Sequence, residues 1–256
     1  MKTLHLLIAA LLLASHAFGR ENPYDLLGHC LTPFVTLIAE HAKDPNRALN
    51  LVMHLEQMTG LPEELSGAKA DFALEYPDKL RIHAPLQGED ITVCRNGQEV
   101  WVFPGSKAGA LLQKLESDRK LPKGDSKYAL APFSLPIPEK QIVFLPTLFQ
   151  VRDAGDEVVD GISCRVLDVG LNTALAKAVK SEEWSGRLWV SADAHPVRLV
   201  LRQGTTWSAT VRFDTVTFQR TLPAETWKPL PEQATDVAKI SPMRYDQLLR
   251  ALIGGK

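Results

Sequence analysis

A spacing of two between apolar residues, repeated over most of the chain, is the feature that most restricts its fold. Successive side chains of a strand point to opposite faces of a sheet, so this spacing predicts half-buried strands. Several such segments lie within residues 67–104, separated by turn residues at 77–79 and 88–90. Asn96-Gly97 is the strongest short hairpin signal in the sequence. Residues 67–104 therefore predict an antiparallel meander of about four strands.

Residues 157–220 show the same alternation and predict a second meander. Val197, Leu199 and Leu201 recur at every second position after a turn at residues 192–196. Residues 171–179 predict one short helix within this region. The two meanders together favour a single β-rich domain over residues 20–256, ending in a tail at residues 221–256.

The region before the first meander has a helical spacing instead. Asn22-Pro23 begins a stretch in which apolar residues recur every three or four positions, and Pro33 interrupts it. A second stretch, residues 47–58, has apolar side chains at positions 49, 52, 53 and 55. We therefore expect two N-terminal helices within residues 22–60.

Residues 106–155 are apolar and rich in proline, which denies them long regular elements. Pro136 and Pro138 enclose an isoleucine, and a strongly apolar run follows from Ile142 to Val151. Such a segment is too hydrophobic to be a solvated linker. We expect it to lie over another apolar surface, as a lid would.

Residues 1–19 have the order of a secretory signal peptide. Lys2 gives a positive start, an apolar run extends from Leu4 to Leu13, and small residues precede a cleavage site after Gly19. The run is shorter than the roughly 20 apolar residues that a membrane-spanning helix needs. A short buried helix is the alternative. We therefore expect an exported protein that does not itself span the membrane.

Charge and motifs argue against nucleic acid and against enzymes. The chain has 29 Lys and Arg against 30 Asp and Glu, a formal net charge of −1, whereas phosphate backbones attract proteins with a clear basic excess. The sequence contains no His-Glu-x-x-His, Cys-x-x-Cys or Gly-x-Ser-x-Gly motif and no glycine-rich phosphate loop. We therefore expect no catalytic residue, no metal and no cofactor.

The three cysteines, Cys30, Cys94 and Cys164, allow one disulfide in an oxidising compartment and leave one thiol over. Cys94 and Cys164 both fall in strand-like segments, so this pair is favoured over pairs with Cys30. Three buried free cysteines are an equal alternative.

Three segments, in this order, resemble the superfamily of periplasmic lipoprotein carriers and receptors, the LolA/LolB type. Residues 70–82 (ADFALEYPDKLRI) resemble its strand, proline turn and strand. Residues 91–104 (ITVCRNGQEVWVFP) resemble its hairpin with an apolar and aromatic second strand. Residues 186–198 (GRLWVSADAHPVR), followed by 211–218, resemble its later hairpins. The resemblance covers residues 67–230.

The resemblance implies an α+β fold in which a curved antiparallel sheet forms an incomplete β-barrel closed by helices that act as a lid. It implies a periplasmic, monomeric, non-enzymatic carrier or binding protein for lipid or for the acyl chains of a lipoprotein. A role in outer-membrane lipoprotein sorting, with inner- or outer-membrane sorting partners, belongs to the same implication. The alternative on this fold is a sensor or scaffold that binds an envelope protein partner.

The implied cavity would be lined by sheet residues and covered by lid residues. A fully packed core without a cavity is the alternative, because apolar alternation reports burial only. Tyr76 stands where the carriers have a basic residue that holds the lid shut; the nearest basic residue is Arg81. The predicted ligand-binding set is Phe72, Leu74, Tyr76, Leu80, Arg81, Ile82, Trp101, Phe103, Phe144, Leu148 and Phe149.

Overall fold

The computed structural model describes residues 20–39, 43–60, 63–86, 88–107, 128–135, 139–178 and 183–246. The expected signal peptide, residues 1–19, lies outside these ranges. The strands are β1 (Ala48–Thr59), β2 (Ala68–Glu75), β3 (Lys79–Leu86), β4 (Glu89–Asn96), β5 (Glu99–Phe103), β6 (Phe149–Val159), β7 (Ile162–Leu171), β8 (Trp184–Ser191), β9 (Pro196–Gln203), β10 (Trp207–Gln219) and β11 (Ala238–Ile240).

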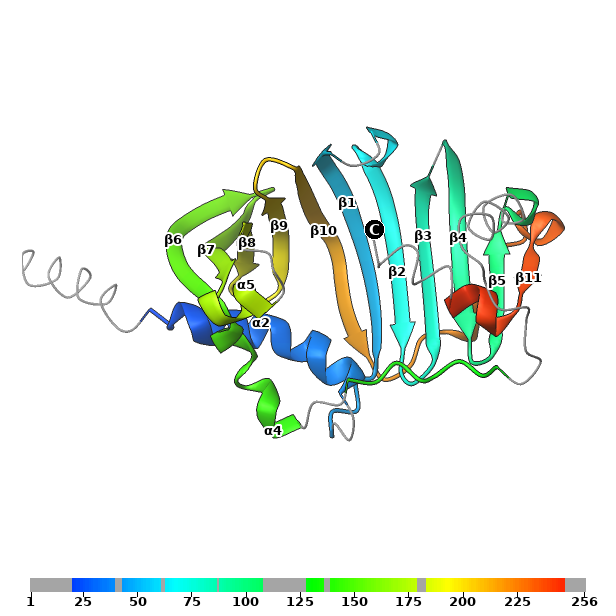
Figure 1. Ribbon diagram of the computed structural model, residues 1–256, viewed down its shortest axis with the longest axis horizontal. Helices are drawn as coiled ribbons and strands as arrows, with labels where there is room; N and C mark the ends of the chain where they lie inside the picture. Colours follow the sequence, from blue (N-terminus) through cyan, green and yellow to red (C-terminus); the bar gives the residue numbers. More distant parts are fainter. Residues whose placement is uncertain are drawn as a thin grey trace, which may run out of the picture.

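These strands form one eleven-stranded sheet in the order β11-β5-β4-β3-β2-β1-β10-β9-β8-β7-β6. Every neighbouring pair is antiparallel. The sheet is curved, and its end strands β11 and β6 lie far apart (Figure 1). The protein therefore has the predicted α+β fold, built on an open sheet that does not close into a barrel.

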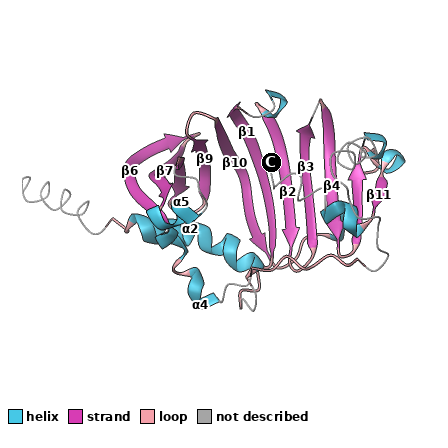
Figure 2. Ribbon diagram, viewed as in Figure 1, coloured by secondary structure: helices cyan, strands magenta, loops and turns pink. Residues whose placement is uncertain are grey.

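The helices are few and short beside this sheet (Figure 2). Asn22 caps the longest one by accepting a hydrogen bond from the backbone N–H of Tyr24, and Pro23 takes the first helical position, where its missing N–H costs nothing. The described helices are α2 (Pro23–Ile38), α4 (Glu139–Ile142) and α5 (Thr173–Ala178), with 3₁₀ turns η1 (Glu63–Leu65), η2 (Leu145–Leu148), η3 (Ala224–Trp227) and η4 (Ala234–Asp236).

Both predicted meanders are confirmed. The first, β2 to β5, turns at Asn96-Gly97, where Asn96 pairs with Glu99 and Gly97 has a φ of +66°, a value that favours glycine. The second, β6 to β10, begins at Phe149 and so takes in the last part of the expected lid. α5 confirms the short helix expected after residue 171.

The prediction of a second N-terminal helix is wrong, because residues 48–59 form strand β1. β1 pairs with β2 on one side and with β10 on the other, and thus joins the two meanders at the centre of the sheet. Its apolar residues fit both periods, since Leu49, Leu51 and Met53 also recur at every second position. Pairing on both sides decides between the two patterns, because it satisfies the backbone hydrogen bonds that a helix would otherwise satisfy internally.

The sheet buries apolar side chains on both of its faces. We call the face against which α2 packs the helix face; Leu51, Leu74 and Leu80 lie there in the first meander and β1, and Leu167 and Leu188 in the second. The opposite face, here the far face, carries Cys94 and Trp101 in the first meander and Val166 and Trp189 in the second. α2 crosses both halves of the sheet, since its first turns pack with Leu167 and its last turns with Leu74.

The predicted disulfide between Cys94 and Cys164 is not formed, and all three cysteines are buried free thiols. Cys94 lies in β4 and Cys164 in β7, and β3, β2, β1, β10, β9 and β8 lie between these strands in the sheet. A disulfide requires Cα atoms within about 7 Å, whereas adjacent strands alone are about 4.8 Å apart. The two positions are both buried in strands on the far face, but they lie in distant parts of the sheet.

Candidate ligand-binding cavity

An apolar cavity of about 330 Å³ lies between α2 and the helix face of β6 to β10. From α2 it is lined by Leu27, Cys30, Leu31 and Phe34, and from the sheet by Phe149, Leu188, Leu199, Leu201 and Phe213, among others. Its volume falls within the roughly 300–1,000 Å³ of known ligand sites. The side chains around it are almost entirely apolar, so it suits a hydrophobic ligand.

Small residues in the sheet leave this space open. Gly170 in β7 and Ser185 and Gly186 in β8 lie side by side and line the cavity. A Cβ at Gly186 would meet Leu201 Cδ2 and the Val200 carbonyl oxygen, each at 3.3 Å. A larger side chain at Gly186, which pairs with Val169 and Leu201 on the helix face, would fill part of the gap beneath α2. Side chains at positions 170 and 185 point to the far face instead, because successive residues of a strand alternate between the faces. The missing side chain of Gly186, which α2 does not replace, thus helps to keep the cavity open.

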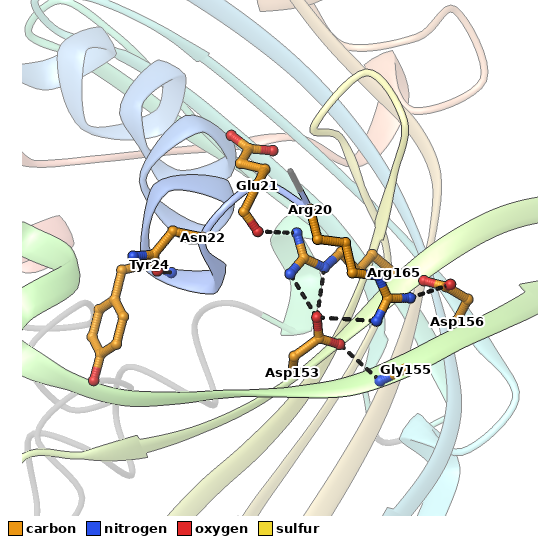
Figure 3. A network of polar contacts seen from close by, with 8 residues as sticks. All are labelled: Arg20, Glu21, Asn22, Tyr24, Asp153, Gly155, Asp156 and Arg165. Atoms are coloured by element: carbon orange, nitrogen blue, oxygen red, sulfur yellow. Dashed lines mark hydrogen bonds and ion pairs between the residues drawn. The ribbon is translucent and has the colours of Figure 1, made fainter. Parts of the chain in front are cut away.

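A polar network fastens the first residues of α2 to the end of the sheet (Figure 3). Arg165 of β7 donates to the Glu21 carbonyl oxygen and to Asp153 Oδ2 of β6. Arg20 forms ion pairs with Asp153 and Asp156. The helix that covers the cavity is therefore tied to β6 and β7 by charge-assisted hydrogen bonds, which are among the stronger kinds in proteins.

Asp153 is the acceptor at the centre of this network. Partial burial would raise the pKa of its carboxyl group, but hydrogen bonds from the Gly155 N–H and from Arg165, with the charges of Arg165 and Arg20, lower it overall. Asp153 therefore stays ionised and keeps its partners down to more acidic pH than an ordinary aspartate. The N-terminal tie of α2 is consequently stable at neutral pH.

The other end of α2 is held by Arg47, at the entrance to β1. Its guanidinium donates to the Ala39 carbonyl oxygen at 3.0 Å and lies over the Tyr76 ring, 3.9 Å from the ring centre. The Leu135 N–H donates to the Ile38 carbonyl oxygen at 2.9 Å. Tyr76 thus has a basic partner from the neighbouring strand, and together these residues fix the end of the helix.

The residues around the cavity suit the binding of an apolar ligand but include few reactive groups. Cys30 is its one thiol among the described lining residues, and burial raises the pKa of that thiol to about 12. A thiol with such a pKa is almost fully protonated at neutral pH and is a poor nucleophile. Among the described residues, no group of His, Cys, Asp or Glu could hold a metal ion.

Of the predicted ligand-binding residues, only Phe149 borders this cavity. Phe72, Leu74, Leu80 and Ile82 lie on the same face of the sheet but in the first meander, where they pack with the last turns of α2. The structure therefore brings these four together in a filled core rather than around a hollow.

The remaining predicted residues lie elsewhere. Trp101 and Phe103 pack on the far face, where the Trp101 indole N–H donates to the Trp227 carbonyl oxygen at 3.1 Å. Arg81 pairs directly with Cys94 of that far-face cluster in the register of β3 and β4. Phe144 and Leu148 are exposed, by 63% and 39%. These two belong to a short segment that packs along α2 and does not cover the cavity.

Sequence reasoning missed the cavity residues of α2 and of the second meander. The signal was present, because Leu27, Leu31 and Phe34 form one apolar face of a helix and Leu199 and Leu201 alternate in a strand. The pattern does not indicate which of the apolar faces packs against small residues and therefore leaves a space unfilled. Within the described ranges, moreover, no helix is long and apolar enough to cross a membrane.

No family model and no curated protein sequence matches this chain, but solved structures are similar to it. Lipoprotein LppX of Mycobacterium tuberculosis shares 14% identity at a TM-score of 0.41, over 78% of this chain and 97% of that one. A chain of the MucA/MucB complex of Pseudomonas aeruginosa shares 13% at 0.43, over 83% and 62%. A LolA superfamily protein of Nitrosomonas europaea shares 10% at 0.29, over 82% and 99%. These structures thus include a LolA superfamily protein, the type that residues 67–230 resemble.

Proposed function

We propose that this protein is a non-enzymatic binding protein or carrier that holds the acyl chain of a lipid or lipoprotein in the cavity between α2 and β6 to β10. The single observation that carries the proposal is the cavity itself: about 330 Å³ of space surrounded almost wholly by apolar side chains. A polar ligand would lose its hydration there without gaining hydrogen bonds. A hydrocarbon chain has no hydrogen bonds to lose, and its transfer from water into the apolar cavity is favourable.

The energetics of such a site are sufficient for function. Each buried methylene contributes roughly 0.8 kcal/mol, so a chain of several methylenes binds without any charged contact. Phe34, Phe149 and Phe213 add broad, rigid surfaces to the lining. Export to the periplasm, a monomeric state and a place in outer-membrane lipoprotein sorting complete the proposal; they are supported by the signal-peptide pattern and by the resemblance of residues 67–230.

The direct test is native mass spectrometry of the exported protein purified from the cell envelope, followed by organic extraction. A stoichiometric adduct that extracts as lipid, or a co-purified acylated protein, supports the carrier and identifies its cargo. An empty protein is then titrated with N-phenyl-1-naphthylamine, a neutral apolar dye that becomes fluorescent on burial. A protein without adduct that also fails to bind the dye would refute the proposal.

A cavity-filling variant assigns the binding to this site. Leu31→Trp, on the cavity side of α2, should abolish dye binding while leaving the fold intact, because the added indole occupies open space. Val158→Trp is the matched control: Val158 is 72% exposed in β6 and does not line the cavity. Equal dye binding by both variants would place the dye elsewhere.

The second candidate is a sensor or scaffold that binds a partner protein in the envelope. The observation that favours it is β6, an edge strand of 11 residues whose side chains are mostly exposed. An exposed edge can accept an extended peptide as an additional strand. A partner protein that co-purifies with a lipid-free chain, and is lost when Asp156 in β6 is replaced by proline, would favour this candidate over the carrier.

A further inference from the structure

A second hollow, of about 450 Å³, lies on the far face of the same strands that form the apolar cavity. Its walls combine polar and apolar residues, and three arginines from three strands contribute to it: Arg152 of β6, Arg187 of β8 and Arg202 of β9. The chain as a whole is near neutral, with a formal net charge of −1. A group of three guanidinium ions in one hollow is therefore a local feature that the overall charge does not explain.

The sheet register brings these arginines together. Arg152 stands opposite Asp168, and Asp168 stands opposite Arg187, so the three side chains form a row across β6, β7 and β8. Arg202 is opposite Ser185, two positions from Arg187 along β8. Arg187 and Arg202 are thus diagonal neighbours, about 7–8 Å apart. Arg152 and Arg202 stand three strands apart, about 14 Å at the backbone, and only their long side chains bring the two guanidinium groups to the same hollow.

Internal partners neutralise only one of the three charges. Arg187 donates to both carboxylate oxygens of Asp168, at 2.7 and 3.2 Å. Within the described part of the chain, Arg152 and Arg202 form no ion pair and no side-chain hydrogen bond. Two nearby arginines of the second meander and β10 differ, since Arg198 pairs with Glu56 and Arg212 with Asp160 and Asp214. Among its lining residues the hollow thus has three arginines and one aspartate, an excess of two positive charges. One further carboxylate lies beside it: Glu157 accepts a hydrogen bond from the Trp189 indole N–H at 2.8 Å.

One glycine and a serine form the floor between these arginines. Gly170 and Ser185 are opposite each other, and both share the far face with Asp168 and Arg187. Without larger side chains there, the guanidinium groups surround a space that a ligand can enter. Gln150 and Ser185 add neutral hydrogen-bonding groups to the charged ones.

We propose that this hollow is a binding site for a phosphate group. Guanidinium forks match the oxygens of phosphates and carboxylates. Arginines on three strands offer more donors than the two oxygens of one carboxylate can accept, whereas a phosphate group presents three or more acceptor oxygens. The phosphate can belong to a lipid headgroup or to a soluble phosphate ester, because the site recognises only the group they share.

The site stands apart from the proposed acyl-chain cavity, although both share Gly170, Ser185 and Gly186 in their walls. One lies on the helix face and the other on the far face of β6 to β9. Inorganic phosphate has no apolar part, so it reports on the arginine hollow alone. A failure of phosphate binding leaves the acyl-chain proposal untouched, and the reverse also holds.

The test is titration calorimetry of the exported protein with inorganic phosphate at constant ionic strength, since exposed charges are screened by salt. The double variant Arg152→Gln/Arg202→Gln should weaken phosphate binding at least about tenfold, because two charge-assisted contacts are lost. The matched control is Lys69→Gln/Arg220→Gln, which removes the same charge at exposed positions outside the hollow. The control should bind phosphate as the unmodified protein does.

Absence of saturable phosphate binding, or an equal loss in both double variants, would overturn the site. A second arm separates the two sources of phosphate: phosphatidylcholine vesicles with and without phosphatidylglycerol. Co-sedimentation that requires phosphatidylglycerol and is lost in Arg152→Gln/Arg202→Gln assigns the site to a lipid headgroup. Phosphate binding without co-sedimentation assigns it to a soluble phosphate ester.

Discussion

The two halves of the sheet use the same strand pattern but differ in what lies against them. We call β2 to β5 with β11 the packed half, and β6 to β9 the hollow half; β1 and β10 join them. Both halves are antiparallel meanders with buried leucines on the helix face. The apolar cavity described above lies against the hollow half. The covering segments differ between the halves, and Gly186 in β8 adds to the difference because it has no side chain beneath α2.

The packed half is covered on both faces. On its helix face, Phe133 packs with the last turns of α2, and Leu130 and Tyr245 pack with β5. On its far face, Trp227 closes over Cys94 and Trp101. In the hollow half, one helix covers one face, and the far-face cluster around Trp189 consists of sheet residues alone. The half of the sheet that is covered on both faces forms a core on each of them. The half that is covered on one face keeps surface available for ligands.

The largest expected difference between the halves is in the cost of removing a leucine. Leu74→Ala in the packed half should lower the free energy of unfolding by about 3 kcal/mol, because it creates a new cavity in a filled core. Leu201→Ala in the hollow half should cost about 1 kcal/mol, since that side chain already borders open space. Urea unfolding of both variants checks this. Equal costs would mean that the space beneath α2 is closed in solution.

The next largest effect concerns Arg95, a buried cation of the packed half that is 3% exposed. It donates to the carbonyl oxygens of Gly97 and Ala131, at 2.9 and 2.8 Å, and so holds residues 128–135 on the sheet. Arg95→Met should cost about 2 kcal/mol, because two partly buried carbonyls lose their charged donor. Arg202→Met, at an exposed position of the hollow half, is the control and should cost less than about 0.5 kcal/mol.

Urea unfolding measures both arginine variants, and limited proteolysis locates the change. Cleavage within residues 128–135 should appear in Arg95→Met and not in Arg202→Met. If the two variants unfold at the same urea concentration, the cover of the packed half does not depend on Arg95.

The strands of both halves could be predicted from the sequence because alternation and turn residues are local. The turn at Asn96-Gly97 and the strands around it need no information from elsewhere in the chain. β1 could not be predicted in this way, since Leu49, Val52, Met53 and Leu55 also satisfy a helical spacing. Only its pairing with both β2 and β10 decides the question, and β10 lies far from β1 along the chain.

The candidate site was harder to predict than the fold for a related reason. Phe72 and Phe149 have equally favourable patterns, yet one packs in a core and the other borders a cavity. A deciding residue is Gly186, whose contribution is the absence of a side chain on the helix face. A single glycine in a strand pattern indicates a close approach or a gap, and spacing alone does not say which. The predicted pairing of Cys94 with Cys164 failed because strand order is not local information.

An intermediate effect is expected for two phenylalanines that the sequence treats as one group. Phe149→Asp places a charge at the cavity wall and should weaken binding of the neutral naphthylamine dye at least about tenfold, because the ionised carboxylate resists burial. Phe144→Asp is the matched control: Phe144 is 63% exposed and should leave dye affinity unchanged. Fluorescence titration measures both, and Phe149→Ala serves as a second variant if the aspartate impairs folding. If both aspartate variants weaken dye binding equally, position 149 is no more important for dye binding than position 144.

The smallest expected effect separates the two ends of α2 by pH. In the hollow half the helix is tied through Asp153, whose lowered pKa gives stability that is present above the ordinary aspartate pKa of about 3.9 and lost as pH falls through the folded value. In the packed half the tie runs from Arg47 to the backbone carbonyl oxygen of Ala39 and contains no carboxylate. Acid should therefore release the first turns of α2 before the last, by no more than about 1 kcal/mol. Hydrogen exchange at pH 7 and pH 3, corrected for intrinsic rates, measures this difference, and Asp153→Asn should remove its pH dependence. If both ends lose protection together in acid, α2 responds as one unit and the two halves do not hold it independently.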